Sequence, residues 1–336
     1  MPRQLTPSLR GELDELAGTS GFSGVVRIDR GGDMELGAAY GLADRRYRIP
    51  NGLDTLFGIA SGTKSLTAAT VISLVEDGVL ELGTTARSLL GSDLPLIRDD
   101  VTVEDLLAHR SGIGDYYDED VHSSSLDYVL PVPVHELTAT ERYLTVLDGH
   151  ETKFEPGERF AYCNSGYVVL ALLAERASGI AFDELVRARV CEPAGMADTA
   201  FLRMDELPAR AAVGYLEKDG LRTNVLHLPV RGSGDGGIFA TVADVSAFWR
   251  GFFGGEIVSA VWIAEMTRPR HDEGPKSYGL GFWLDPSGGS VALEGADAGV
   301  SFRSVRLPAE ELTHTVISNT SDGAWPLARL LRDRLA

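Results

Sequence analysis

The sequence predicts an α/β protein of the α+β type, with a central antiparallel sheet built from both chain termini and flanked by helices. Strand-like alternation of apolar and polar residues occurs near the start of the chain, in residues 22–51. It returns in short segments between residues 278 and 319. The long section between these regions carries mostly helical patterns and loops. Because the strands come from the two ends, we expect the middle of the chain to form an inserted lobe.

The first elements follow from local patterns. Residues 1–18 have the pattern of an amphipathic helix. The alternation that follows lies on both sides of Arg30-Gly31-Gly32-Asp33, which predicts a β-hairpin closed by a glycine turn. In residues 61–80, apolar side chains recur at helical spacing, and Gly78 stands near the predicted end of the helix.

The last part of the chain predicts strands and a final helix. The strand candidates are YGLGFWLD at 278–285, SVALEGADAG at 290–299, SFRSVRLP at 301–308 and HTVISN at 314–319. The tail AWPLARLLRDRLA, at 324–336, has a helical pattern.

These elements imply two lobes. We expect a sheet lobe from residues 1–80 and 231–336 and a mostly helical lobe from residues 81–230. The sequence has no internal repeat and no low-complexity linker. A cleft between two such lobes is a common place for a site.

Composition excludes several classes of partner. The 336 residues carry a net charge of −18, which argues against nucleic acid or an anionic membrane as a partner. The longest apolar run, residues 167–174, is too short to span a bilayer, and the N-terminus lacks the apolar core of a signal peptide. Cys163 and Cys191 show neither disulfide-framework nor zinc spacing. We expect a cytoplasmic protein without metal or cofactor; nothing indicates its oligomeric state.

One short segment, FGIASGTKSLTAAT at 57–70, allows two chemical interpretations. A phosphate-binding P-loop needs four residues between its glycines and a glycine directly before the lysine. Here only three residues separate Gly58 from Gly62, and Thr63 precedes Lys64, so this interpretation is rejected. The alternative is a nucleophilic serine, Ser61, whose partner Lys64 lies one helical turn later on the same face. Chance alone gives about one Ser-x-x-Lys in such a chain, so the motif needs support.

Four segments provide that support. They are FGIASGTKSLTA at 57–68, VTVEDLLAHRSGI at 101–113, FEPGERFAYCNSGY at 154–167 and GGIFATVADVSAF at 236–248. In this order and at these spacings, the chain resembles the serine β-lactamase and penicillin-binding-protein superfamily, in its class C β-lactamase and esterase-like branch. The resemblance covers nearly the whole chain. The last of the four segments resembles an element whose role is structural.

The resemblance implies a role for each polar residue of these motifs. Ser61 would be the nucleophile, activated by Lys64, because a serine hydroxyl needs a base within hydrogen-bond reach. Tyr162, as a phenolate or by sharing a proton with Lys64, would relay that proton to the leaving group. Asn164 would orient Lys64 or hold the acyl amide of the substrate. His109 is interpreted as a structural residue that braces a loop.

The third family motif is where this sequence departs from the pattern. Relatives carry Lys-Thr-Gly or His-x-Gly there, whereas the best register places Glu294-Gly295-Ala296 at those positions. By analogy, the backbone N–H groups of Ser61 and Asp297 would form the oxyanion hole. A carboxylate at Glu294, joined by Asp235, would repel a substrate carboxylate. The alternatives are a different register or a Glu294 side chain turned away from the cleft.

The predicted function is a serine hydrolase that works through an acyl-enzyme on Ser61, an esterase or amidase for a small neutral or amine-bearing substrate. An acyltransferase in a biosynthetic pathway would use the same residues. A β-lactamase or D,D-peptidase is disfavoured by Glu294 and by the expected location, and a non-catalytic binding module by the complete motif set. The acidic run DYYDED, at 115–120, is interpreted as a solvated loop that could border the cleft.

Overall fold

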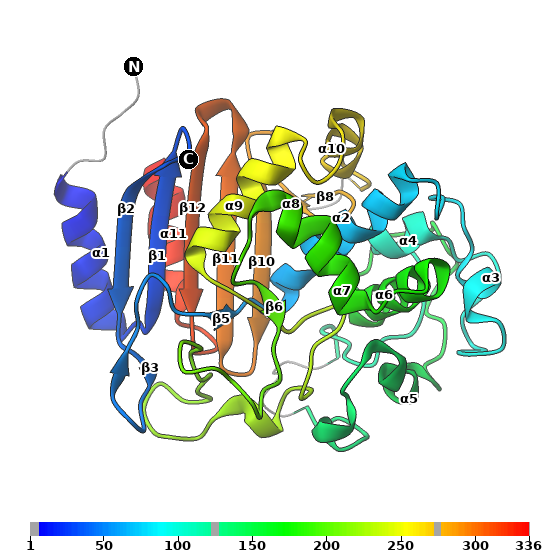
Figure 1. Ribbon diagram of the computed structural model, residues 1–336, viewed down its shortest axis with the longest axis horizontal. Coiled ribbons are helices and arrows are strands. Elements are labelled where there is room, and N and C mark those ends of the chain that lie inside the picture. The colour runs from blue at the N-terminus through cyan, green and yellow to red at the C-terminus, as the bar shows by residue number, and fades with distance from the viewer. Residues whose placement is uncertain (1–6, 122–127, 272–276, 336) are drawn as a thin grey trace.

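The computed structural model describes residues 7–121, 128–271 and 277–335, and its core is a seven-stranded antiparallel sheet (Figure 1). The strand order is β2-β1-β12-β11-β10-β9-β8. The strands are β1 (Gly24–Arg30), β2 (Asp33–Tyr40), β8 (Ser277–Tyr278), β9 (Trp283–Leu284), β10 (Val291–Asp297), β11 (Val300–Leu307) and β12 (Leu312–Ser318). Because β1 pairs along its length with β12, the two ends of the chain share one sheet. The predicted fold class is confirmed.

The N-terminal predictions agree with the structure. Helix α1 spans Pro7–Ser20, and residues 1–6 of the predicted helix lie outside the described residues. The hairpin β1–β2 turns at Gly31 and Gly32, whose φ angles of 59° and 91° favour glycine.

The segment 278–285, predicted as one strand, forms parts of two. Strands β8 and β9 are antiparallel neighbours joined by a tight turn. Gly281 in this turn has a φ of 91°, and a Cβ added there would lie 2.2 Å from the Cβ of Ala68. The turn is therefore fixed by its close approach to helix α2 (Thr63–Glu76). The alternation of apolar and polar residues in the sequence gives no sign of this contact.

Helices cover both faces of the sheet (Figure 1). Helix α1 and the C-terminal helix α11 (Ala324–Leu335) pack on one face of the sheet. They contact apolar side chains of β1 and β12, with which they form one core cluster. Helices α2 and α9 (Val242–Gly254) cover the other face and belong to a second, larger core. The predicted tail helix is thus confirmed at 324–335.

The remaining elements lie mostly in the middle of the chain. The helices are α3 (Ala86–Leu90), α4 (Val103–Leu107), α5 (Leu144–Leu147), α6 (Asn164–Ser178), α7 (Phe182–Val186), α8 (Glu192–Ala194) and α10 (Ala260–Met266). Short 3₁₀ or π turns occur at Ala60–Gly62 (η1), Val134–Glu136, Thr140–Tyr143, Arg187–Cys191, Asn224–Leu226 and Pro308–Glu310. A two-stranded ribbon pairs β3 (Leu42–Asp44) with β4 (Ile49–Pro50).

Helix α6 is buried almost along its whole length, which explains its apolar sequence. Among the described residues, no single helix has the length and apolar composition needed to cross a membrane. Helix α6 together with residues 182–194 passes that test as a pair bent by 86°, by length and composition only.

A small three-stranded sheet positions the Ser61 segment and the glycine-rich segment around Asp235. Its order is β5 (Phe57–Gly58), β7 (Ile238–Ala240) and β6 (Ala200–Phe201). Strand β5 leads directly into the Ser61 segment, and β7 follows the glycine-rich segment that contains Asp235. This sheet therefore brings two segments together that are more than 170 residues apart in the chain.

Candidate active site

Ser61 lies in η1, the 3₁₀ turn between β5 and helix α2. The preceding residue, Ala60, has a φ of 44°, a left-handed conformation that is unusual for alanine. The backbone N–H of Ile59 donates to Ile238 O at 2.9 Å and holds the turn against β7. A Cβ at Gly62 would lie 2.5 Å from the ring of Phe302, so this glycine serves close packing rather than phosphate binding.

Lys64 is buried, with 2% of its surface exposed, and its ammonium group has three acceptors. Nζ donates to Ser61 Oγ at 2.9 Å, to Asn164 Oδ1 at 2.8 Å and to the backbone oxygen of Asp235 at 2.7 Å. The three acceptors come from three separate segments of the chain. They aim Nζ at the serine hydroxyl, the geometry that a nucleophile–base pair requires.

Tyr162 completes the group around Lys64. Lys64 Nζ lies 5.0 Å from the centre of the Tyr162 ring. Burial raises the pKa of Tyr162 well above its usual value, and the charge of Glu119 raises it further, while a hydrogen bond with Ser61 opposes both effects. Since burial disfavours the phenolate, the structure favours a neutral Tyr162 that shares or passes on a proton.

His109 accepts hydrogen bonds from the backbone N–H groups of the two residues that flank Tyr162 in the sequence. Ala161 N donates to His109 O at 2.9 Å, and Cys163 N donates to His109 Nδ1 at 3.1 Å. The imidazole ring also lies 4.4 Å from the Tyr162 ring. Burial and the charge of Lys64 lower the pKa of His109 well below its usual value, so the ring is neutral and Nδ1 accepts. This geometry agrees with a bracing role.

Replacing His109 by alanine should loosen Tyr162 and lower kcat by about 10-fold, because small misplacements of a catalytic group are costly. His109→Asn should lose less, since asparagine tolerates the φ of 54° found here and its amide oxygen can accept from Cys163 N. Steady-state kinetics and thermal unfolding of both variants check this. Equal losses in both would contradict a role for the accepted hydrogen bond.

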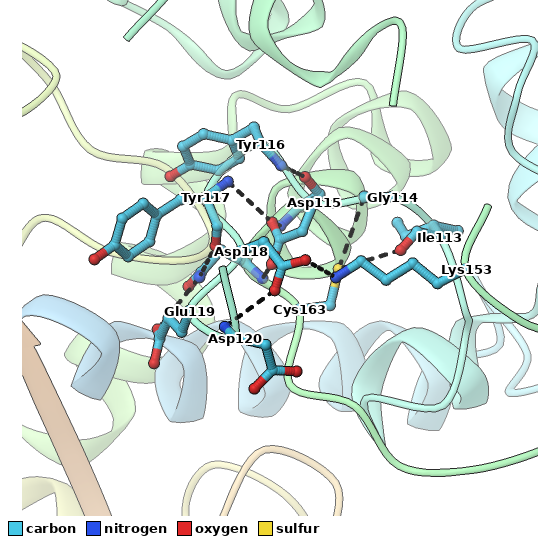
Figure 2. Close-up of polar contacts among 12 residues, drawn as sticks. Ile113, Gly114, Asp115, Tyr116, Tyr117, Asp118, Glu119, Asp120, Lys153 and Cys163 are labelled. Carbon is cyan, nitrogen blue, oxygen red and sulfur yellow. Dashed lines mark hydrogen bonds and ion pairs between the residues drawn. The ribbon is translucent and has the colours of Figure 1, made fainter. Parts of the chain in front are cut away.

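The acidic run at 115–120, whose side chains Figure 2 shows, holds Asn164 at the start of helix α6. Asp115 Oδ2 accepts from Asn164 N at 2.8 Å, and Oδ1 accepts from Ser165 N at 2.9 Å. The carboxylate therefore caps the unpaired N–H groups of the helix from another segment. Burial raises the pKa of Asp115, and these two donors oppose that effect. The run is thus not simply a solvated loop.

The same run also contacts Asn164 and Asp235, the two residues besides Ser61 that accept hydrogen bonds from Lys64. Asn164 Nδ2 donates to Tyr117 O at 2.9 Å and to Glu119 Oε1 at 3.3 Å. The hydroxyl of Tyr116 donates to the carboxylate of Asp235. Sequence reasoning missed these roles because the partners lie about 50 and 120 residues away.

Asp115→Ala should lower kcat by about 10- to 100-fold, because Asn164 would lose the cap that fixes its position. The loss of the cap should also cost about 1–2 kcal/mol of stability. Asp120→Ala is the matched control, since Asp120 belongs to the same run but is exposed. Kinetics and chemical denaturation of both variants measure the two effects, and an unchanged kcat in Asp115→Ala would remove the positioning role.

The side chain of Glu294 does not face the cleft, so the expectation that its carboxylate would repel a substrate carboxylate is wrong. A Cβ at Gly295 would lie 2.3 Å from Ile59 O and 2.8 Å from Ser61 N, so position 295 faces the nucleophile. Side chains alternate along a strand, and Glu294 therefore lies on the opposite face. There it forms an ion pair with Arg303 of β11. Its charge is neutralised away from the substrate.

The register of β10 also corrects the oxyanion donor. Asp297 and Val300 flank a two-residue turn and form a hydrogen-bonded pair, so the N–H of Asp297 points to β11. The N–H of Ala296 then points to the other edge of β10, where the pairing with β9 ends at Ala292. Ala296, together with Ser61, is therefore the better-placed backbone donor.

Acidic side chains do border the nucleophile, although Glu294 is not one of them. Asp297 and Asp235 line one cavity beside Ala60, and Glu119 reaches Asn164. Burial raises the pKa of Asp235, an effect that the charge of Lys64 opposes. Within the described ranges, no group of three His, Cys, Asp or Glu side chains is placed to hold a metal ion.

Known proteins are similar to this chain along nearly its whole length. The family model described as beta-lactamase matches residues 9–335. The D-aminopeptidase of Brucella anthropi is 31% identical over 282 residues, which cover 80% of this chain and 50% of that protein. Two penicillin-binding proteins of Bacillus subtilis are 28% and 27% identical, and the match spans 66% and 69% of their length.

Several solved structures have the same fold as this chain. A penicillin binding protein from Bacillus halodurans superposes with a TM-score of 0.90 at 33% identity, covering 96% of this chain and 100% of that one. The octameric penicillin-binding protein homologue from Pyrococcus abyssi gives 0.81 at 27% identity, covering 97% and 77%. A D-amino acid amidase from Ochrobactrum anthropi shares the fold, with a TM-score of 0.78 at 24% identity, covering 97% of both chains. The chain belongs to the beta-lactamase family, and its D-aminopeptidase and penicillin-binding relatives support a serine hydrolase.

Proposed function

We propose that the protein cleaves an ester or amide of a small, neutral or amine-bearing substrate through an acyl-enzyme on Ser61. The observation that carries this proposal is the hydrogen bond of 2.9 Å between the buried Lys64 Nζ and Ser61 Oγ, in a group that also contains Tyr162 and Asn164. A serine hydroxyl beside a base is the arrangement that forms covalent acyl intermediates.

The geometry supports a two-step reaction. The ammonium group of Lys64 must first give up one proton to solvent; Ser61 Oγ then attacks the carbonyl carbon as the Lys64 amine takes the hydroxyl proton, and the N–H groups of Ser61 and Ala296 hold the oxyanion. Tyr162 passes a proton to the leaving group, which departs as an alcohol or amine, and regains one from Lys64. Water then attacks the acyl ester, and Ser61 is released with its proton restored.

The charge around the nucleophile supports an amine-bearing substrate. Asp235, Asp297 and Glu119 all act electrostatically on the site, and each would repel a substrate carboxylate. An ammonium group is attracted by the same charges. The similarity to a D-aminopeptidase is consistent with this preference.

The pH dependence of substrate binding tests this charge argument. Burial raises the pKa of Asp297 to about 7; Asp235 also raises it, while Ala298 N–H and Lys64 lower it. The carboxyl is therefore neutral below pH 7 and charged above it. For an ester with a quaternary ammonium, KM should fall about three- to tenfold from pH 6 to 8. Asp297→Asn should abolish this fall, and KM of a neutral ester should show none; a parallel fall for both esters would contradict the assignment.

Acyl-enzyme formation tests the proposed function itself. The protein and Ser61→Ala are incubated with a short-chain p-nitrophenyl ester, an amino-acid p-nitroanilide and a penicillin, and intact mass and product are recorded. We expect turnover or an adduct that requires Ser61, with little reaction of the carboxylate-bearing penicillin. Rapid penicillin acylation would favour a β-lactamase or D,D-peptidase, and transfer to an added alcohol would favour an acyltransferase. No adduct with any compound or with a fluorophosphonate probe would favour a binding module.

A further inference from the structure

The backbone at Lys153 lies in close contact with the segment that leads into the acidic run at 115–120. Lys153 N donates to Gly112 O at 2.7 Å. A Cβ at Gly112 would lie 2.1 Å from Phe154 O, so no side chain fits between the two segments. Because Asp115 follows Gly112 by only three residues, this contact fixes the position of Lys153 relative to the run.

The side chain of Lys153 points toward the same run (Figure 2). Its Nζ forms an ion pair with Asp118 Oδ2 at 2.7 Å, and 26% and 19% of the two side chains are exposed. Solvent and salt screen such a partly buried pair less than a pair on the surface. Burial lowers the pKa of Lys153, but the hydrogen bond and the charge of Asp118 outweigh this effect and raise the pKa above its usual value. Lys153 is therefore charged at neutral pH.

The charge of Lys153 also acts on Asp115, the carboxylate that caps helix α6. Burial raises the pKa of Asp115, while the N–H groups of Ser165 and Asn164 and the charge of Lys153 oppose that effect. Burial also raises the pKa of the phenols and the thiol whose ionisation Asp115 disfavours, so these groups are neutral; they belong to Tyr116, Tyr128, Tyr162 and Cys163. The other titratable side chains of the run are acidic: Asp118, Glu119 and Asp120. Among the described residues, Lys153 is the cation whose charge favours the ionised form of Asp115.

Resting on the proposed function, we propose that Lys153 is a positioning residue, whose charge keeps Asp115 ionised and thereby keeps Lys64 aimed at Ser61. The Asp115 carboxylate accepts from Asn164 N at 2.8 Å, and Asn164 Oδ1 accepts from Lys64 Nζ at 2.8 Å. A protonated Asp115 presents an O–H group in place of one of its acceptor oxygens. It then loses part of the cap that fixes Asn164.

The pH profile of Lys153→Met tests this role, because a purely structural loss would lower activity equally at every pH. For a neutral p-nitrophenyl ester, kcat/KM should fall from pH 8 to pH 6 about three- to tenfold more steeply than in the unmodified protein. Lys153→Arg should restore the original profile. Asp118→Asn breaks the same ion pair but keeps the charge of Lys153, and it should not steepen the fall. Lys218→Met controls for the loss of one exposed positive charge.

The variant Asp115→Asn shows whether the effect passes through Asp115. Adding Lys153→Met to this variant should not steepen the profile further. An equally steep fall in this background would mean that Lys153 acts on Lys64 directly and would overturn the inference. Equal profiles for Lys153→Met and Asp118→Asn would also overturn it, because the ion pair would then serve only to hold the run in place.

Chemical denaturation measures the same coupling without turnover. The folded-state pKa of Asp115 is raised, so its carboxylate costs stability as pH rises through that pKa, and the loss of Lys153 enlarges this cost. The destabilisation by Lys153→Met should therefore grow from pH 6 to pH 8, and Asp115→Asn should abolish this growth. Ser61-dependent turnover with unchanged pH profiles and no such growth would overturn the inference and leave the hydrolase intact. Growth without any Ser61-dependent product or adduct would support the coupling of Lys153 to Asp115 and overturn the hydrolase.

Discussion

Lys64→Met is expected to lower the rate of acylation by about 10³-fold or more, because it removes the base that aims at Ser61 Oγ. Methionine matches the length of the lysine stem, so the buried packing around the side chain is kept. Two structural acceptors, Asn164 Oδ1 and Asp235 O, lose a donor, which destabilises the fold. Removal of a buried charge offsets part of that cost. Activity should therefore fall far more than stability.

Stopped-flow release of p-nitrophenol measures the acylation step, and thermal unfolding measures stability. Lys218→Met is the control for the loss of one positive charge, since Lys218 is exposed. An acylation rate in Lys64→Met within 10-fold of the unmodified protein would show that Lys64 only holds the site together. Tyr162 would then be the base, although its raised pKa disfavours the phenolate.

Motif spacing was sufficient to predict which residues meet at the nucleophile. Ser61, Lys64, Tyr162 and Asn164 come from two of the motif segments, and the structure brings these four together. Asp235 was expected only to add negative charge to the pocket, and it is its backbone oxygen that accepts from Lys64. The sheet was predictable for a similar reason, because alternation is a local property and both termini showed it. The acidic run was not predictable in the same way, since Asp115 caps a helix that begins 49 residues later.

The direction of Glu294 depended on information that alternation alone does not contain. A shift of one residue in register moves every side chain of a strand to the other face. The register of β10 is fixed by its turn with β11 and by the approach of Gly295 to the Ser61 turn. A lone glycine inside a strand often marks such an approach. Had Gly295 been taken as the residue of closest contact, Glu294 would have been placed on the far face.

The same contact leads to a second large effect, in Gly295→Ala. The added Cβ would lie 2.3 Å from Ile59 O, 2.8 Å from Ser61 N and 2.9 Å from Gly62 N. All three atoms belong to the backbone, so no side chain can rotate to make room. Either β10 or the Ser61 turn must move, and each carries one of the two proposed oxyanion donors, Ala296 N–H and Ser61 N–H. We expect kcat to fall about 100-fold or more and stability to fall by about 1–3 kcal/mol.

Separate measurements of the two effects decide what this glycine does. Gly11→Ala in helix α1 is the matched control, because nothing lies within 4 Å of the added Cβ and alanine favours a helix. It should keep full activity and gain stability. If Gly295→Ala unfolds at a lower temperature but keeps its kcat, the contact is structural only and the oxyanion donors lie elsewhere. If kcat falls in a protein that remains folded at the assay temperature, the approach of β10 to Ser61 sets the position of the oxyanion hole.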